Sequence, residues 1–131
     1  MRAAVLAIGV SMAALAAAAQ DAEEGGDLFQ GFCAACHGTE ARGDGPMAAI
    51  LEVLPADLTK LAADNDGTLP VARIAQRIDG RDPLLAHGGP MPLYGDFFEG
   101  SDTAIRAETG QPILTSQPIA DLIAWLESIQ E

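Results

Sequence analysis

Basic side chains are scarce in this sequence of 131 residues. Seven Lys and Arg residues face 19 Asp and Glu residues, which gives a formal net charge of −12 at pH 7. Lys60 is the only lysine. This balance argues against binding to nucleic acid or to an anionic membrane surface, because both carry negative charge. It fits a protein partner with a basic docking face, although the same acidity also serves solubility alone.

Long apolar runs are scarce too, and the one present lies near the start of the chain. A single arginine precedes an apolar, alanine-rich stretch from Ala3 to Ala19. The last three alanines of this stretch match the small-residue pattern of a signal-peptidase site. We expect residues 1–19 to be a cleaved signal peptide and residues 20–131 to form one exported domain without a membrane span. An uncleaved anchor is the alternative, but so short and alanine-rich a stretch makes a weak transmembrane helix.

Cysteine occurs only twice, at Cys33 and Cys36, and His37 follows directly. Cys-x-x-Cys-His is the sequence signal for covalent attachment of c-type haem. Cysteines three positions apart share one side of a helical turn, so each thiol can reach one vinyl group while the adjacent imidazole ligates the iron. A Cys33–Cys36 disulfide, as in a thioredoxin-like protein, is the competing interpretation. It is disfavoured because no β-branched strand pattern precedes Cys33.

Aromatic residues are few, with four Phe, one Tyr and one Trp in the whole chain. A domain this small has little apolar material with which to build a core. A covalently held haem would supply a large apolar centre, as cofactors and cross-links do in other small domains. We therefore expect the haem to be a component of the core as well as a redox group.

The apolar periodicity predicts an all-α domain of about four to five short helices. We expect helices from Asp27 into the cysteine motif, from Pro46 to Leu54, from Pro70 to Gly80, briefly over residues 102–108, and from Pro118 to Ile129. Proline at a helix start and glycine at a helix end support several of these bounds. The polar stretch 20–26 is expected to fray, and the proline-rich stretch 81–94 to form an irregular loop. No alternating strand pattern of any length is present.

Several motifs together resemble the class I cytochromes c, especially small periplasmic bacterial members. They are GDLFQGFCAACHG, GDGPMA, PADLT, GGPMPLYG and IADLIAWLESIQ, which cover nearly the whole chain after the leader. The resemblance implies an all-α cytochrome c-like fold around one covalently bound haem c, with the N- and C-terminal helices crossing beside the haem edge. It also implies that Gly25 and Phe29 meet Trp125 and neighbouring apolar residues at this crossing, and that the protein is periplasmic.

The second axial ligand of the haem iron is expected at Met91. Its Pro- and Gly-rich loop is where the family presents a ligand methionine opposite the proximal ligand, here His37. Met47 lies instead on an apolar helical face, where methionine usually fills gaps in a core. His87, whose imidazole also binds haem iron, and an open sixth position are the alternatives.

Other residues are candidates for contacts around the haem. Pro55, or less readily Pro46, is expected to place a backbone carbonyl on the ring N–H of His37, as a proline does in this family. Arg77 and Arg81 are candidates for pairing with a buried propionate, since a buried carboxylate needs a charged partner. A solvated helix face explains both arginines equally well. Tyr94 is a candidate hydrogen-bond donor to a propionate.

The sequence favours an electron carrier over an enzyme. It contains one haem motif and no plausible pair of nucleophile and base for other chemistry. With both axial positions filled, no substrate can bind the iron. Two alternatives stay open. The chain is a haem subunit of a larger oxidoreductase, or a haem protein whose open site binds a small ligand, as in a peroxidase or a gas sensor.

Overall fold

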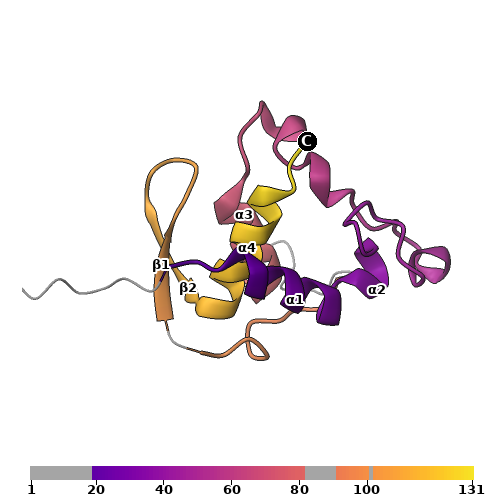
Figure 1. The fold of residues 1–131 in the computed structure, drawn as a ribbon, viewed down its shortest axis with the longest axis horizontal. Helices are drawn as coiled ribbons and strands as arrows, with labels where there is room; N and C mark the ends of the chain where they lie inside the picture. The colour runs from indigo at the N-terminus through magenta and orange to yellow at the C-terminus, as the bar shows by residue number, and fades with distance from the viewer. Residues whose placement is uncertain (1–18, 82–90, 101) are drawn as a thin grey trace, which may run out of the picture.

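The computed structural model describes residues 19–81, 91–100 and 102–131, which form a mostly helical domain (Figure 1). In chain order the elements are α1 (Ala22–Phe32), α2 (Ala34–His37), the 3-10 turns η1 (Ala48–Ile50), η2 (Leu58–Lys60) and η3 (Ala63–Asn65), α3 (Val71–Asp79), β1 (Asp102–Arg106), β2 (Pro112–Ser116) and α4 (Gln117–Ser128). Helices α1 and α4 meet at the centre, the β1–β2 hairpin projects at one end, and α2 lies at the other (Figure 1). No helix in these ranges is both long and apolar enough to cross a membrane. The expected signal peptide lies, except for Ala19, outside the described residues and stays a prediction.

Two glycines allow α1 and α4 to approach closely. A Cβ at Gly25 would collide with the backbone carbonyl of Asp121, so only glycine fits there. Phe29 stacks on Trp125 with ring centroids 4.3 Å apart, as expected from the resemblance. Gly25 lies at the crossing as expected, against the backbone of Asp121 and Leu122, and the indole ring of Trp125 lies over Gly26.

Helix α1 begins five residues before the expected start at Asp27. The side chain of Asp21 accepts hydrogen bonds from the backbone N–H groups of Glu23 and Glu24, which caps the helix. The backbone N–H of Asp21 itself donates to the buried carboxylate of Asp121 on α4, at 2.8 Å. Capping and packing against α4 therefore outweigh the low helix propensity of the two glycines, and residues 20–26 are ordered.

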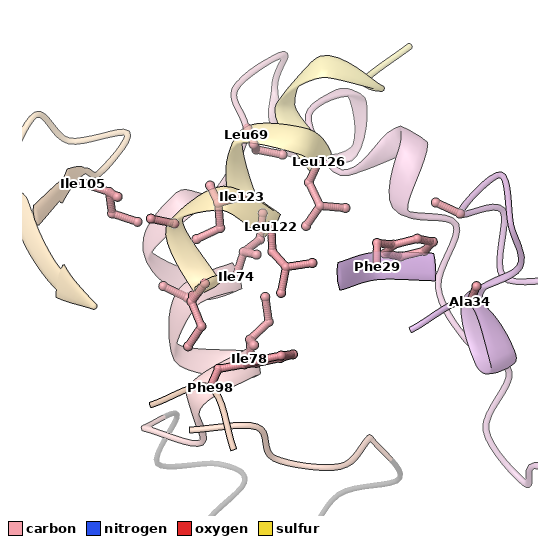
Figure 2. Packing of buried hydrophobic residues seen from close by; sticks show 14 residues of the cluster. Phe29, Ala34, Leu69, Ile74, Ile78, Phe98, Ile105, Leu122, Ile123 and Leu126 are labelled. Atoms are coloured by element: carbon pink, nitrogen blue, oxygen red, sulfur yellow. The ribbon is translucent and has the colours of Figure 1, made fainter. Parts of the chain in front are cut away.

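The core lies between α4, α1 and α3. Ile119, Leu122 and Ile123 of α4 are each about 2% exposed. Figure 2 shows Leu122 extending toward the side on which Phe29 of α1 lies. Helix α3 adds its own buried apolar stripe and matches its expected range closely, between Pro70 and the left-handed Gly80. Its first turn is capped from elsewhere in the chain, because the N–H of Ala72 donates to the side chain of Glu108.

Residues 102–116 form a two-stranded antiparallel hairpin, so the helix expected over residues 102–108 is wrong. Ile105 pairs with Ile113 and Thr103 with Thr115 across the hairpin. Ile105 is 5% exposed while its neighbours in β1 are not buried, which is the alternation of a strand with one covered face. The segment is too short for its period to distinguish a strand from a helix, and pairing with β2 decides the outcome.

The amphipathic helix expected from Pro46 to Leu54 is also wrong. Only η1 forms there, and the chain then runs extended toward Pro55. A helix of two turns between two prolines is marginal in water unless it packs on another element. Apolar side chains near the end of this segment line a cavity instead of forming one face of a helix. Val53 and Leu54 are 59% and 75% exposed, and they line the cavity described below.

Candidate haem-binding site

A cavity of about 450 Å³ lies between α1, α3, α4 and the segment 51–61. This volume is within the range of about 300 to 1,000 Å³ that is typical of cofactor sites. Most of the lining is apolar, as a porphyrin ring requires, and it includes Phe29, Leu54, Leu61, Ile74, Leu122 and Leu126. Leu122 and Leu126 of α4 therefore belong both to the core and to the lining of the cavity.

Cys33, Cys36 and His37 all line this cavity. Cys33 ends α1 and starts α2, with its N–H donating to the carbonyl of Phe29 and its own carbonyl accepting from the N–H of His37. Both cysteines are free thiols. Burial raises the pKa of the Cys33 thiol to about 11, and a negative charge on Cys36 adds to the effect. The helical turn thus presents two thiols and an imidazole to one apolar space.

The imidazole of His37 is held by a backbone carbonyl. Its Nδ1 lies 3.0 Å from the carbonyl oxygen of Ala56. A carbonyl can only accept, so Nδ1 carries the hydrogen and Nε2 keeps a lone pair for a metal. The sequence predicted that Pro55 supplies this carbonyl. The oxygen of Pro55 instead lies against Gly43, and the next carbonyl in the chain reaches the ring.

Hydrogen bonds also hold the backbone of the motif from the loop that follows it. Gly43 donates to the carbonyl of His37 at 2.7 Å, and Gly45 donates to the carbonyl of Cys36 at 3.1 Å. Met47 donates to the carbonyl of Ala35 at 2.9 Å. A four-residue helix such as α2 leaves most of its carbonyls unpaired by itself. The loop 38–47 therefore completes the hydrogen bonding that the short helix cannot.

The structure separates the two methionines of the described chain. Met91 is half-buried, lines the cavity and packs against the buried core. Met47 is 42% exposed and is not among the cavity residues. The alternative ligand His87 lies outside the described residues. Of the two described thioethers, only that of Met91 shares a cavity with His37.

The three other side chains predicted near the haem have different outcomes. Arg77 lines the cavity. Arg81 does not, because its guanidinium binds the carboxylate of Asp79 and donates to the carbonyl of Leu114 on β2, at 2.9 Å. Tyr94 also lines the cavity. Its hydroxyl donates to the backbone carbonyl of Phe32 at 3.1 Å, so its hydrogen is already used and is not directed at a propionate. Burial raises the pKa of this hydroxyl, with the charges of the two cysteines adding, so it stays protonated and able to donate.

Two kinds of lining residue were not predicted from the sequence. Arg73 lines the cavity together with Arg77, one helical turn away on the same face of α3. That spacing was the available signal for it. Phe32 and Phe98 line another part of the wall, with ring centroids 5.4 Å apart in an edge-to-face arrangement. The helical spacing of Phe32 marks an apolar face, but no local pattern pairs it with Phe98, which lies 66 positions later in the sequence.

The residues present fit a haem group attached through two cysteines. The cavity is apolar, two thiols and an imidazole with a free Nε2 face it, and two arginines lie on its α3 side. The model of the Cytochrome c family matches residues 22–130 of the chain. Neither a curated protein nor a solved structure gave a significant match. The match confirms the predicted cytochrome c-like fold and the haem c cofactor, with the small β1–β2 hairpin as an addition to the helices. The chain therefore belongs to the cytochrome c family, with a covalently bound haem c and a role in electron transfer.

Proposed function

We propose that this protein is an exported, periplasmic electron carrier that holds one electron at a time on a haem c with His37 and Met91 as axial ligands. One observation carries the assignment. Cys33, Cys36, His37 and Met91 come from two distant parts of the chain and line the same apolar cavity. When bound, the haem supplies an iron that alternates between two oxidation states.

The two cysteines provide covalent retention. Cys33 and Cys36 would each hold the haem through one thioether to a vinyl carbon; the thiol hydrogen would pass to the neighbouring carbon, so no oxidant would be needed. The raised pKa of the Cys33 thiol keeps it protonated at neutral pH, which disfavours disulfide exchange in its place. The turn that presents both thiols is the one held by the loop 38–47.

The two ligands set the chemistry of the iron. The hydrogen bond from Nδ1 of His37 to Ala56 orients the ring and increases its basicity. A thioether from Met91 favours ferrous iron and raises the reduction potential relative to two histidines. Arg73 and Arg77 offer positive charge to the propionates at an otherwise apolar wall. Both axial positions are then filled, which suits electron transfer and leaves no site for a substrate.

The acidic composition supports a redox partner with a basic docking face. The net charge is −12 and Lys60 is the only lysine, so the protein itself has no lysine-ringed docking face. Charges further apart than a Debye length, about 8 Å at physiological ionic strength, are screened by salt. Electron transfer to a basic partner should therefore slow as salt rises. A flat salt profile would contradict electrostatic docking.

The axial ligands can be tested by spectroscopy of the purified holoprotein. We expect a ferric iron–sulfur charge-transfer band that is lost in Met91→Ala and kept in Met47→Ala. Retention of the band in Met91→Ala would rule out this ligand. Rapid binding of carbon monoxide to the ferrous wild-type protein would favour an open site and a ligand-binding role. Co-purification of a stoichiometric partner would favour a subunit of a larger oxidoreductase.

A further inference from the structure

A glutamine distant from the haem motif in sequence holds the segment that positions His37. The side chain of Gln130 follows α4 and makes three hydrogen bonds to backbone groups. Its Oε1 accepts from the N–H of Ala62 at 2.8 Å, and its Nε2 donates to the carbonyls of Leu58 and Leu126 at 2.9 and 2.7 Å. A primary amide has two donor hydrogens and two acceptor lone pairs, so three of its four positions are used. Its interactions join the end of α4 to the segment 58–62.

The segment that Gln130 holds is the one that contacts His37. Leu58 is two residues beyond Ala56, whose carbonyl accepts from Nδ1 of His37. The N–H of Leu58 donates to the carbonyl of Ala41 at 2.7 Å, which links the segment to the loop after the motif. Leu58 is thus bonded on its N–H side to that loop and on its carbonyl side to Gln130.

The residue after Gln130 reinforces this arrangement. The N–H of Glu131 donates to the buried Thr59 of η2 at 2.9 Å, and its carboxylate pairs with Arg42 in the loop after the motif. Figure 1 shows the end of the chain beside the magenta segment that contains η2 and η3. The Arg42–Glu131 pair is exposed, so solvent screens it. The partly buried amide of Gln130 is the stronger of the two connections.

We propose that Gln130 is a positioning residue for the haem ligand His37, acting through the backbone from Leu58 to Ala56. This inference rests on the proposed function, in which His37 ligates the iron. The hydrogen bond from Nδ1 to the Ala56 carbonyl places more negative charge on the ring, which stabilises ferric iron. Release of the segment lengthens this bond. The reduction potential then rises, because the ferric state loses more stabilisation than the ferrous state.

The test compares Gln130→Ala with Gln117→Ala in the holoprotein. Gln117 is a matched control, because it is also a glutamine of the α4 region, and its amide donates to the carboxylate of Asp121 instead of to the segment 58–62. Three quantities are measured: the reduction potential, the exchange rate of the Nδ1 hydrogen of His37 by NMR, and the melting temperature. Gln130→Ala should raise the potential and speed the exchange. Gln117→Ala should lower only the melting temperature.

A second variant separates the two roles of the amide. Gln130→Glu keeps an acceptor for Ala62 and removes both donors, so it should speed the exchange as Gln130→Ala does; its added negative charge lowers the potential by itself, so only the exchange is compared in this variant. Wild-type potential and exchange in Gln130→Ala overturn the proposal, even if the melting temperature falls. A wild-type holoprotein without a His37 resonance shifted by the iron overturns the ligation itself. Failure of the inference and failure of the proposed function are therefore distinguished.

Discussion

The α1–α4 crossing and the cavity wall formed by residues 51–61 are both apolar, but different groups cover them. At the crossing, protein side chains cover one another: Phe29 stacks on Trp125, and Leu122 is 2% exposed. In the wall, Val53 and Leu54 are more than half exposed and face the cavity. The proposed haem is the group that covers them.

This difference explains why the two regions have different backbones. The crossing consists of two helices of 11 and 12 residues whose close contact depends on glycine. The wall consists of irregular chain around Pro55 followed by the 3-10 turn η2. A helix needs an apolar partner along its whole length, whereas irregular chain can fit its side chains to a flat ligand. Four variants test this division, and they follow from the largest expected effect to the smallest.

Removing both thiols should have the largest effect. Cys33→Ala combined with Cys36→Ala leaves no group that can form a thioether, so we expect complete loss of covalently bound haem. Haem staining after denaturing electrophoresis measures this directly. Cys36→Ala alone, with one thioether left, should keep the stain. A stained band from the double variant would contradict the assignment of the two cysteines.

The crossing can be disrupted through Gly25. In Gly25→Ala the new Cβ meets the backbone of Asp121, and relief of the collision requires the helices to separate. Overpacking of this kind costs about 1 to 3 kcal/mol. Gly31→Ala in the same helix is the control, since nothing lies within 4 Å of its Cβ, and it should gain up to about 1 kcal/mol of stability. Urea unfolding of the holoproteins measures both, and equal stability of the two variants would contradict the close contact.

The wall can be tested through Leu54. Leu54→Ser removes an apolar side chain that faces the cavity, so we expect the holoprotein to lose about 1 kcal/mol of stability. Leu114→Ser on β2 is matched in chemistry and exposure, because the two leucines are 75% and 70% exposed. Leu114 does not line the cavity and its replacement should have little effect. Equal losses in the two variants would mean that the haem does not cover Leu54.

The smallest effect is expected at the exposed pair Arg42–Glu131, which joins the end of the chain to the loop after the motif. A hydrogen bond from Arg42, and then its charge, hold the pKa of Glu131 below its ordinary value of 4.5. Glu131 has its lowered pKa in the folded protein and its ordinary pKa of 4.5 in the unfolded chain. At a pH between the two, the unfolded chain binds more protons than the folded one, so the free energy of unfolding rises with pH in this window. The contribution is fully present above the ordinary pKa and is lost as the pH falls through the folded pKa.

Melting curves of the wild type and Glu131→Gln check this pH dependence. The wild type should melt slightly higher at pH 7, and the difference should shrink below pH 4.5. A difference that does not change with pH would mean that the charge of Glu131 is not involved. Because both side chains are well exposed, high salt should also reduce the difference.

Local signals were sufficient for the parts of the molecule that depend on neighbouring residues. Cys33, Cys36 and His37 share one helical turn, and that turn faces the cavity. Helix α3 begins after Pro70 and ends before Gly80, as expected. Both signals are local, because proline restricts its own φ angle and glycine readily adopts the left-handed conformation. The apolar stripe of α4 likewise follows from its 3.6-residue period.

Long-range contacts decided the rest. Strand β1 was mistaken for a helix because its pairing with β2 is absent from a local window. The carbonyl that accepts from His37 belongs to Ala56 and not to Pro55. The carbonyl of Pro55 lies against Gly43 instead, a contact that the sequence does not show. Arg81 is a candidate partner of a propionate from the sequence alone, but its partner in the structure is Asp79, whose side chain is nearly buried.

The amino-acid sequence by itself determined the cofactor chemistry, the helices α3 and α4 and the acidic charge of this cytochrome c. The tertiary structure alone decided which apolar segment packs on protein and which lines the cavity. It also decided how Gln130, 93 positions after His37, comes to hold the segment behind the imidazole. The physical reason is that side-chain chemistry and local backbone preference act over a few residues. Hydrogen bonds between distant segments depend on the tertiary fold that brings those segments together.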